Sequence, residues 1–133
     1  MSNITNLKEL KEKRYITVNL PGWNIDDVFT CKLKRVSVMD LACKGKIPNP
    51  LIPSVIDLFK GDYKMQDSLK DIDGIKKVND LINFFAEVTL VEPTFKEVEE
   101  AIGLTEEQKM LIYAFAIKGV RAIEPFLEKS GDN

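Results

Sequence analysis

Two neighbouring segments of alternating polarity constrain the fold of this chain more than any other feature of its sequence. In residues 14–20 and again in residues 28–36, apolar side chains recur at every second position. These side chains are Ile16, Val18 and Leu20 in the first segment and Phe29, Cys31 and Leu33 in the second. A period of two is typical of a strand with one buried face. Because Pro21-Gly22 and Asn24 supply turn residues between the segments, we predict an antiparallel β-hairpin over about 14–36.

An isolated hairpin is only marginally stable in water, so its apolar face must pack against another element. The remaining sequence has the capping residues and the apolar spacing that are typical of helices. We therefore predict an α+β fold in which the hairpin packs on four to five helices over about 37–128, within a single domain of 133 residues. The alternative is a mainly helical protein whose hairpin is an arm that pairs with another subunit through a strand edge.

Three prolines within the apolar segment "GKIPNPLIPSVIDLF", residues 45–59, predict a stiff elbow between two helices. Pro48 and Pro50 disfavour helical geometry in the residues before them. We expect Asn49 to cap the second helix, with Pro50 at its first position. Pro53 then lies in the first turn or moves the start to Ser54, and the helix ends near residues 60–61.

The other helices are predicted from caps and apolar spacing. Ser37 is expected to cap residues 38–44, and a helical period begins at Ile75 and stops at Pro93. Two T-x-x-E/Q capping boxes start the last two helices. The boxes are Thr94 with Glu97 and Thr105 with Gln108. The predicted apolar face of the last helix, which Pro125 bends or ends, comprises Met110, Leu111, Ala114, Phe115, Ile117 and Val120.

Two further segments receive weaker predictions. In the N-terminal segment, Ile4, Leu7 and Leu10 are three residues apart, which favours a short helix with a weak apolar stripe. Residues 61–73 are polar and nearly aperiodic, and we predict a flexible loop there.

Composition excludes several kinds of chemistry. The chain has no histidine, which removes Ser-His and Cys-His nucleophile pairs. Its net charge is −2 with acids and bases interleaved, so no nucleic-acid partner is expected. No apolar run approaches the roughly 20 residues of a membrane span, and no secretory signal opens the chain. Cys31 and Cys43 are predicted to be buried free thiols in a reducing cytoplasm.

Neither a metal site nor a catalytic site is expected. The glutamates of residues 97–107 lie in first turns and on polar faces, which solvent and the helix dipole explain. The segment "DIDGIKKVND" lacks the spacing and the closing glutamate of a calcium loop. We assign no catalytic residue, cofactor or metal, and we expect a protein that is not an enzyme.

Aromatic side chains are the candidates for partner binding. Most are expected in the core, but Phe84 and Phe85 are adjacent and point about 100° apart on a helix, which places one of them at an exposed rim. The partner-binding candidates are Phe84, Phe85, Phe95, Tyr113, Phe115 and Phe126.

Three segments carry short strings in a fixed order along the chain. They are "LKRVS" followed by "GKIPNPL" at 45–51, "LVEPT" within 86–100, and an LT-x-x-Q start at residue 104. Together they resemble the tail assembly chaperones of long-tailed phages and prophages of Gram-positive bacteria. The likeness runs from about Val18 to Phe126. Val36 stands where the family pattern has proline, and residues 62–73 match nothing typical of it.

The resemblance implies a non-enzymatic role in the bacterial host cytoplasm. Such chaperones bind the tape measure protein, keep it soluble, help to recruit tail tube protein, and are absent from the finished virion. In many phages a frameshift makes a longer product, and this chain would correspond to the short one. A homo-oligomer is compatible with this role. The alternative is a small interaction or regulatory subunit of a bacterial complex unrelated to phage tails.

Overall fold

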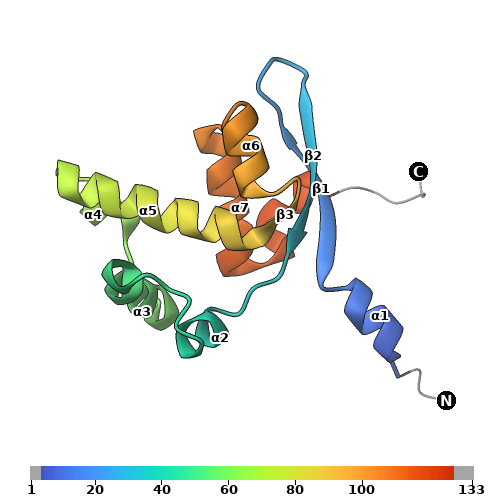
Figure 1. The fold of residues 1–133 in the computed structure, drawn as a ribbon, viewed down its shortest axis with the longest axis horizontal. Coiled ribbons are helices and arrows are strands. Elements are labelled where there is room, and N and C mark those ends of the chain that lie inside the picture. Colours follow the sequence, from blue (N-terminus) through green and yellow to red (C-terminus); the bar gives the residue numbers. More distant parts are fainter. Residues whose placement is uncertain (1–3, 128–133) are drawn as a thin grey trace.

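A computed structural model describes residues 4–127 of the chain. It has the predicted α+β architecture, with a small antiparallel sheet at one side and helices packed against one of its faces (Figure 1). The sheet has three strands in the order β1-β2-β3. They are β1 (Tyr15–Pro21), β2 (Val28–Lys34) and β3 (Leu90–Glu92).

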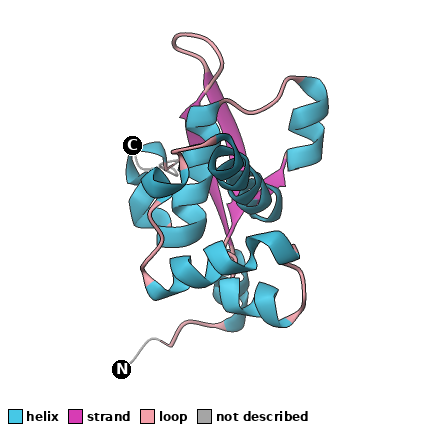
Figure 2. Cartoon of the chain, turned by 90° about the vertical axis from the view of Figure 1, so that its left-hand side faces the viewer, coloured by secondary structure: helices cyan, strands magenta, loops and turns pink. Residues whose placement is uncertain are grey.

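The helical elements of the described residues are seven α-helices and two 3₁₀ segments. They are α1 (Leu7–Glu12), α2 (Val38–Cys43), η1 (Asn49–Leu51), α3 (Ile52–Lys60), α4 (Met65–Ser68), α5 (Ile72–Thr89), α6 (Phe95–Ala101), α7 (Glu106–Lys118) and η2 (Val120–Phe126). Figure 2 looks along α5, which crosses in front of the sheet. α1, at the lower right of Figure 1, stands away from the rest of the chain and has no buried residue.

The predicted hairpin is confirmed. Val18 pairs with Cys31 and Leu20 with Phe29, so the apolar positions of both strands lie on one face. That face is buried against the helices, which rules out the alternative of a hairpin that serves only as an arm. The outer face is polar, and there the Thr30 hydroxyl donates a 2.7 Å hydrogen bond to the Asn19 side chain.

The third strand was not predicted. The sequence analysis continued the helix from Ile75 to Pro93, but α5 ends at Thr89 and Leu90 turns into an extended conformation. Leu90 pairs with Leu33 and Glu92 with Lys32, across a register irregularity. Three residues are too few for a periodic signal in the sequence, and the strand is defined by its pairing with β2.

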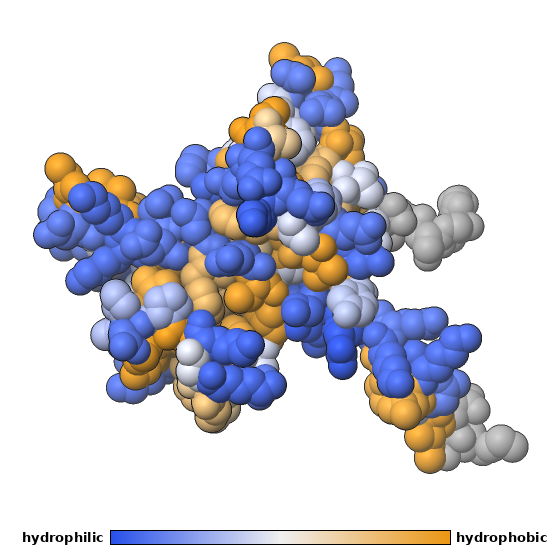
Figure 3. Space-filling view, viewed as in Figure 1, coloured by the Kyte–Doolittle hydropathy of each residue, from blue (hydrophilic) through white to orange (hydrophobic). Residues whose placement is uncertain are grey.

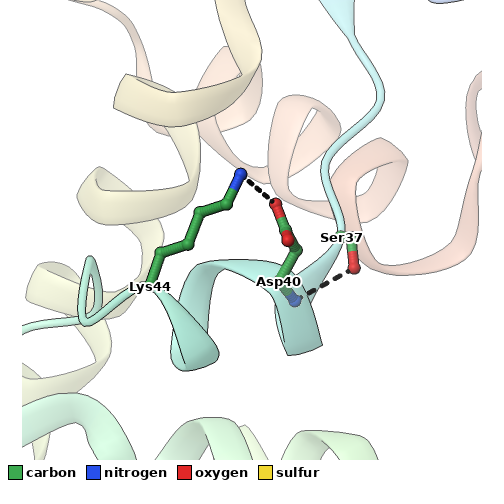
Figure 4. A network of polar contacts seen from close by, with 3 residues as sticks. All are labelled: Ser37, Asp40 and Lys44. Carbon is green, nitrogen blue, oxygen red and sulfur yellow. Dashed lines mark hydrogen bonds and ion pairs between the residues drawn. The ribbon is translucent and has the colours of Figure 1, made fainter.

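Helix starts follow their predicted caps in three of four cases. Ser37 caps α2 by accepting a hydrogen bond from the Asp40 amide, and the Asp40 carboxylate pairs with Lys44 (Figure 4). Both capping boxes, at Thr94 and Thr105, are formed on both sides. The prediction for Asn49 is wrong. Asn49 begins η1, and α3 starts at Ile52 without a side-chain cap, with Pro53 in its first turn.

The segment predicted as a loop at 61–73 is partly helical. It contains α4 and the first residues of α5, which Asp71 caps by accepting from the Gly74 amide. A side chain at Gly74 would collide with the Ser68 carbonyl oxygen. The glycine therefore allows α4 to pack directly onto the first turn of α5, a contact that apolar periodicity cannot reveal.

Two clusters of buried side chains share the interior. The sheet core lies between the hairpin, α6, α7 and η2, and the helical core lies between α2, α3 and α5. The sheet core comprises Val18, Leu20, Phe29, Cys31, Leu33, Ala86, Leu90, Val98, Leu104, Ile112, Phe115 and Ile123. The helical core comprises Ile47, Leu51, Val55, Leu81, Phe84 and Phe85.

α7 lies between the two cores and contacts both. Ile112 and Phe115 are buried in the sheet core, while Tyr113 packs against the helical core. The predicted single apolar face is therefore wrong, since Met110 is exposed and Ile112 is fully buried. A helix that is covered on several sides has no single apolar stripe. Gly119, with a φ of 86°, ends α7 before Pro125 is reached.

The two cysteines differ, and one prediction is wrong. Cys31 is buried in the sheet core as expected, but Cys43 is exposed. Cys43 is the last residue of α2, a helix of six residues that has no buried side chain. Such a short helix contacts its neighbours only through half-buried residues, so its apolar pattern overstates its burial.

Candidate functional site

Most of the predicted partner-binding aromatics are interior residues. Phe84, Phe85 and Phe115 are buried, so the expectation that Phe84 or Phe85 lies at an exposed rim is wrong. Phe85 packs edge-on against both Phe84 and Tyr113, with ring centroids 5.3 and 5.7 Å away. Phe95, Tyr113 and Phe126 are half-buried and pack against the cores. These rings build the scaffold rather than an open apolar surface.

One exposed apolar surface lies on α3. Its side chains Ile52, Ile56 and Phe59 follow one another at spacings of four and three residues, which places them on one face. They are 39%, 46% and 65% exposed. Val55 lies next to these side chains on the same broad face and is buried in the helical core. α3 therefore has one wide apolar face, and we name its exposed part, Ile52, Ile56 and Phe59, the α3 stripe; within the described residues no other element covers it.

A groove next to α5 adds a second apolar surface. It has a volume of about 250 Å³ and lies between α4, α5 and α7. Met65 comes from α4, Leu69 directly follows that helix, Ile75 comes from α5 and Met110 from α7. Glu106 and Lys109 also line the groove. We name it the α4–α5–α7 groove. In Figure 3 apolar atoms gather at the left-hand end of the molecule, over α4 and the start of α5, and again over α3.

The pKa values that the fold shifts all move further away from 7. Burial raises the pKa of Cys31 and of Tyr113 to about 12, and burial also raises the pKa of Tyr63. Hydrogen bonds from the Thr94 amide and hydroxyl lower the pKa of Glu97. The thiol and both phenols therefore stay protonated at neutral pH, and Glu97 stays ionised as part of a helix cap.

Metal binding and membrane insertion find no support in the described part of the chain. Within residues 4–127, no three His, Cys, Asp or Glu side chains come together as a possible metal site. No helix among those residues has the length and apolar character that crossing a bilayer requires.

The amino-acid composition of α3 is the sequence signal that indicates the α3 stripe. Five of the nine residues of α3 are large and apolar, namely Ile52, Val55, Ile56, Leu58 and Phe59. A helix that buries a single face needs about three or four apolar positions in two turns. The surplus on α3 indicates an apolar face that is wider than a single neighbouring element can cover.

Comparison of this chain with protein-family models, with curated proteins and with solved structures finds no match.

Proposed function

We propose that this protein is a phage tail assembly chaperone, which binds helical segments of the tape measure protein and keeps them soluble during tail morphogenesis. The single observation that carries the proposal is the α3 stripe, in which three large apolar side chains lie exposed next to one another on one helix. The identity of the partner rests on the resemblance to tail assembly chaperones described above.

The α3 stripe has the spacing by which amphipathic helices pack against one another. Fully burying a large aliphatic or aromatic side chain contributes roughly 1.5–3 kcal/mol. Because the three side chains are about half exposed, covering them contributes about 2–5 kcal/mol in total. That range suits reversible holding of a client, which must leave when the tail is built.

The α4–α5–α7 groove gives the protein a second apolar surface for binding a helical client. Two of its apolar wall residues are methionines, Met65 and Met110. Methionine side chains are flexible and polarisable, so a surface that contains them accommodates apolar partners of different shape. A tape measure protein is long and largely helical, and a chaperone that covers it must accept many different helical segments.

We propose no catalytic step for this protein. The raised pKa values of Cys31 and Tyr113 keep both side chains in their unreactive protonated forms. The Glu97 carboxylate accepts hydrogen bonds from Thr94 at the start of α6. We further propose that the protein works in the bacterial host cytoplasm and that tail tube protein is a second partner. Both statements derive from the resemblance.

Co-expression with the tape measure protein tests the proposal directly. The soluble fraction of the tape measure protein is measured with the wild-type chain, with I56S/F59S, and with the matched control D57S/K60S, which alters exposed polar residues of the same helix. We expect the wild type and the control to keep the client soluble and I56S/F59S to lose most of that effect. A tape measure protein that is equally insoluble with and without the wild-type chain would contradict the proposal.

Gene neighbourhood separates this proposal from the alternative of an unrelated bacterial interaction subunit. Tail tube and tape measure genes beside the gene for this chain would support the chaperone. Their absence, together with binding of the α3 stripe to a host protein, would support the alternative.

A further inference from the structure

Basic side chains that are spread along the sequence gather beside α2 in the folded chain. Two adjoining hollows lie there, with volumes of about 350 and 520 Å³. Both hollows are lined by Lys34, Val36, Asp40, Leu41 and Lys44, so we treat them as one surface and name it the α2 groove. The groove runs from the open end of the hairpin to the junction of α5 with β3, above α2 in Figure 1.

The charged lining of the α2 groove is predominantly basic. Its cations are Arg14, Lys34, Arg35, Lys44 and Lys46, and its acids are Asp40 and Glu87. The Asp40 carboxylate lies 3.0 Å from the Lys44 ammonium group, so these two charges neutralise each other (Figure 4). Among the described residues the other ion pair joins Lys32 to Glu92, which leaves both arginines, Lys34 and Lys46 without a carboxylate partner. The groove therefore concentrates positive charge on a chain whose net charge is −2.

Strand pairing holds two of these cations close together. The Arg35 amide donates a 3.1 Å hydrogen bond to the Arg14 carbonyl, which continues the pairing of β1 with β2. Like charges directly opposite each other on paired strands are destabilising. An anionic occupant of the neighbouring hollow would relieve this repulsion.

The floor of the α2 groove is apolar, which limits the chemistry of its occupant. Leu90 is buried, and the other apolar lining residues are half-buried. They are Val36, Leu41, Val88 and Val91. A nucleic acid would meet the cations but would leave this floor uncovered, because its affinity comes mainly from phosphates. A polypeptide segment with both carboxylates and apolar side chains matches the cations and the floor together.

The strand next to the groove favours an extended segment over a helix. β3 pairs with β2 on one side, and no described strand pairs with its other side. An edge strand presents unpaired backbone groups, to which an extended segment of another protein can add. Leu90 and Val91 of β3 both line the groove, so a segment bound there lies beside this edge.

We propose that the α2 groove binds an extended segment of a partner protein in which carboxylates alternate with apolar side chains. The apolar side chains cover Val88 and Val91, and the carboxylates face the lysines and arginines of the rim. Lysine and arginine have long apolar stems, so their charges can follow the carboxylates while the stems cover the segment. Opposite charges at such a contact fix its register and speed association.

This site is separate from the surfaces proposed for the client. The α2 groove shares no lining residue with the α3 stripe or with the α4–α5–α7 groove. A segment bound in the α2 groove would leave both of those surfaces accessible. The inference does not depend on binding of the tape measure protein.

Fluorescence anisotropy of labelled synthetic peptides, titrated with the full chain, tests the inference. The probe is a peptide of about nine residues that alternates glutamate with valine, which matches an extended segment with two different faces. We expect a Kd of about 10–100 µM at about 0.05 M salt, weakened at least about tenfold at about 0.5 M salt. A peptide that alternates lysine with valine should not bind, and one that alternates glutamate with serine should bind at least about fivefold more weakly.

Variants of the chain locate the binding site. K34E/K46E reverses two unpaired cations of the groove and is expected to weaken binding at least about tenfold. Because Lys34 is half-buried, R35E/K46E repeats the test with two exposed residues, and circular dichroism confirms that each variant retains its fold. The matched control K76E/K77E, on the exposed face of α5, changes net charge equally and should bind like the wild type. I56S/F59S should also bind like the wild type, so failure of client binding and failure of this site are distinguishable.

Hydrogen exchange gives a readout at the backbone. With the glutamate–valine peptide near saturation, amides of residues 90–92 are expected to exchange at least about threefold more slowly, while those of α4 remain unchanged. Absence of peptide binding up to about 1 mM would overturn the inference. Equal affinity for the glutamate–serine peptide, or for a single-stranded oligonucleotide of the same length, would also overturn it, because charge alone would then explain binding. So would wild-type affinity in K34E/K46E and R35E/K46E, or unchanged exchange at residues 90–92.

Discussion

The sheet core and the helical core are both apolar, but hydrogen bonds fix them to different degrees. Around the sheet core, side chains bridge segments that are far apart in the sequence. Trp23 donates to Gly103 across 80 residues, and the Gln108 side-chain amide donates to the Pro21 carbonyl across 87. Around the helical core, the side-chain hydrogen bonds between described residues are local caps, such as those of Ser37 and Asp71.

This difference indicates that the sheet side and the helical side of the molecule differ in rigidity. Directional bonds between distant segments fix the hairpin to α7, so the sheet side is a rigid scaffold. α2 and α3 are held to α5 by apolar contacts and the chain connection, and such contacts tolerate small shifts of packing. Elements of this kind open with a lower free energy than the global unfolding reaction. The α3 stripe therefore belongs to the half of the molecule that can adapt to a partner.

The largest expected effect comes from removing the ring at the centre of the helical core. Phe85 is fully buried between Phe84 and Tyr113. F85A leaves a cavity there and is expected to lower the free energy of unfolding by about 3–5 kcal/mol, measured by urea denaturation. F59A, on the exposed α3 stripe, is the control and should change it by no more than about 0.5 kcal/mol. A loss below about 1 kcal/mol in F85A would show that the helical core collapses around the gap.

Gln108 tests the polar bridging of the sheet core. Its side-chain oxygen accepts from the Thr105 amide at 2.8 Å and its nitrogen donates to the Pro21 carbonyl at 2.8 Å. Q108L keeps a similar volume and leaves both backbone groups without their partner. We expect unfolding to become easier by about 2–4 kcal/mol, with hydrogen exchange rising in β1 more than in α3. An unchanged stability would mean that water replaces both bonds and that the bridge is not a structural tie.

The contrast also explains what could be predicted from the sequence. The hairpin, α2, α6 and α7 carry local signals, namely a period of two or a capping residue with its partner, and these elements form where they were expected. Each signal lies within a few residues. The caps at Thr94 and Thr105 are examples in which the sequence determines both the donor and the acceptor.

The features that were missed depend on contacts between distant segments. β3 exists because Leu90 lies next to Leu33, and the Trp23 bond exists because the hairpin turn meets Gly103. The α3 stripe was not predicted because the burial of an apolar helix depends on how much of its apolar face the neighbouring elements cover. Phe84 and Phe85 are both buried for the same reason, since α3 and α7 pack on different sides of α5.

Trp23 has a smaller expected effect, because W23F retains much of the aromatic contact. The Trp23 ring is tilted against Phe29 with centroids 5.0 Å apart, and phenylalanine preserves most of that packing. The bond to the Gly103 carbonyl is lost. We expect a decrease of about 1 kcal/mol in the free energy of unfolding, and faster exchange of amides in the hairpin turn. Turn amides that exchange as slowly as in the wild type would show that the indole bond does not hold the turn against α6 and α7.

The smallest effect on stability is expected from replacing the exposed thiol of Cys43. The reactivities of Cys43 and Cys31 nevertheless compare the helical side of the molecule directly with the sheet core. In the folded protein, Cys43 of α2 should react rapidly with a thiol reagent, whereas Cys31 of β2 should react only after unfolding. C43S should remove the rapid reaction and change the free energy of unfolding by no more than about 0.5 kcal/mol. The remaining slow reaction of Cys31 then measures how often the sheet core opens.

The same variant gives a pH test with a defined sign. Burial raises the pKa of Cys31 from 9.0 to about 12 in the folded state. Above pH 9 the unfolded thiol loses its proton while the folded one keeps it, so the unfolded state binds fewer protons and the free energy of unfolding falls as pH rises. In C43S, C31A should remove the part of this slope that begins near pH 9, while the raised pKa values of Tyr113 and Tyr63 leave a further decrease above pH 10. If Cys31 in C43S reacts at pH 9 as fast as Cys43 does in the wild type, the sheet core is open on that time scale and is not the more rigid half.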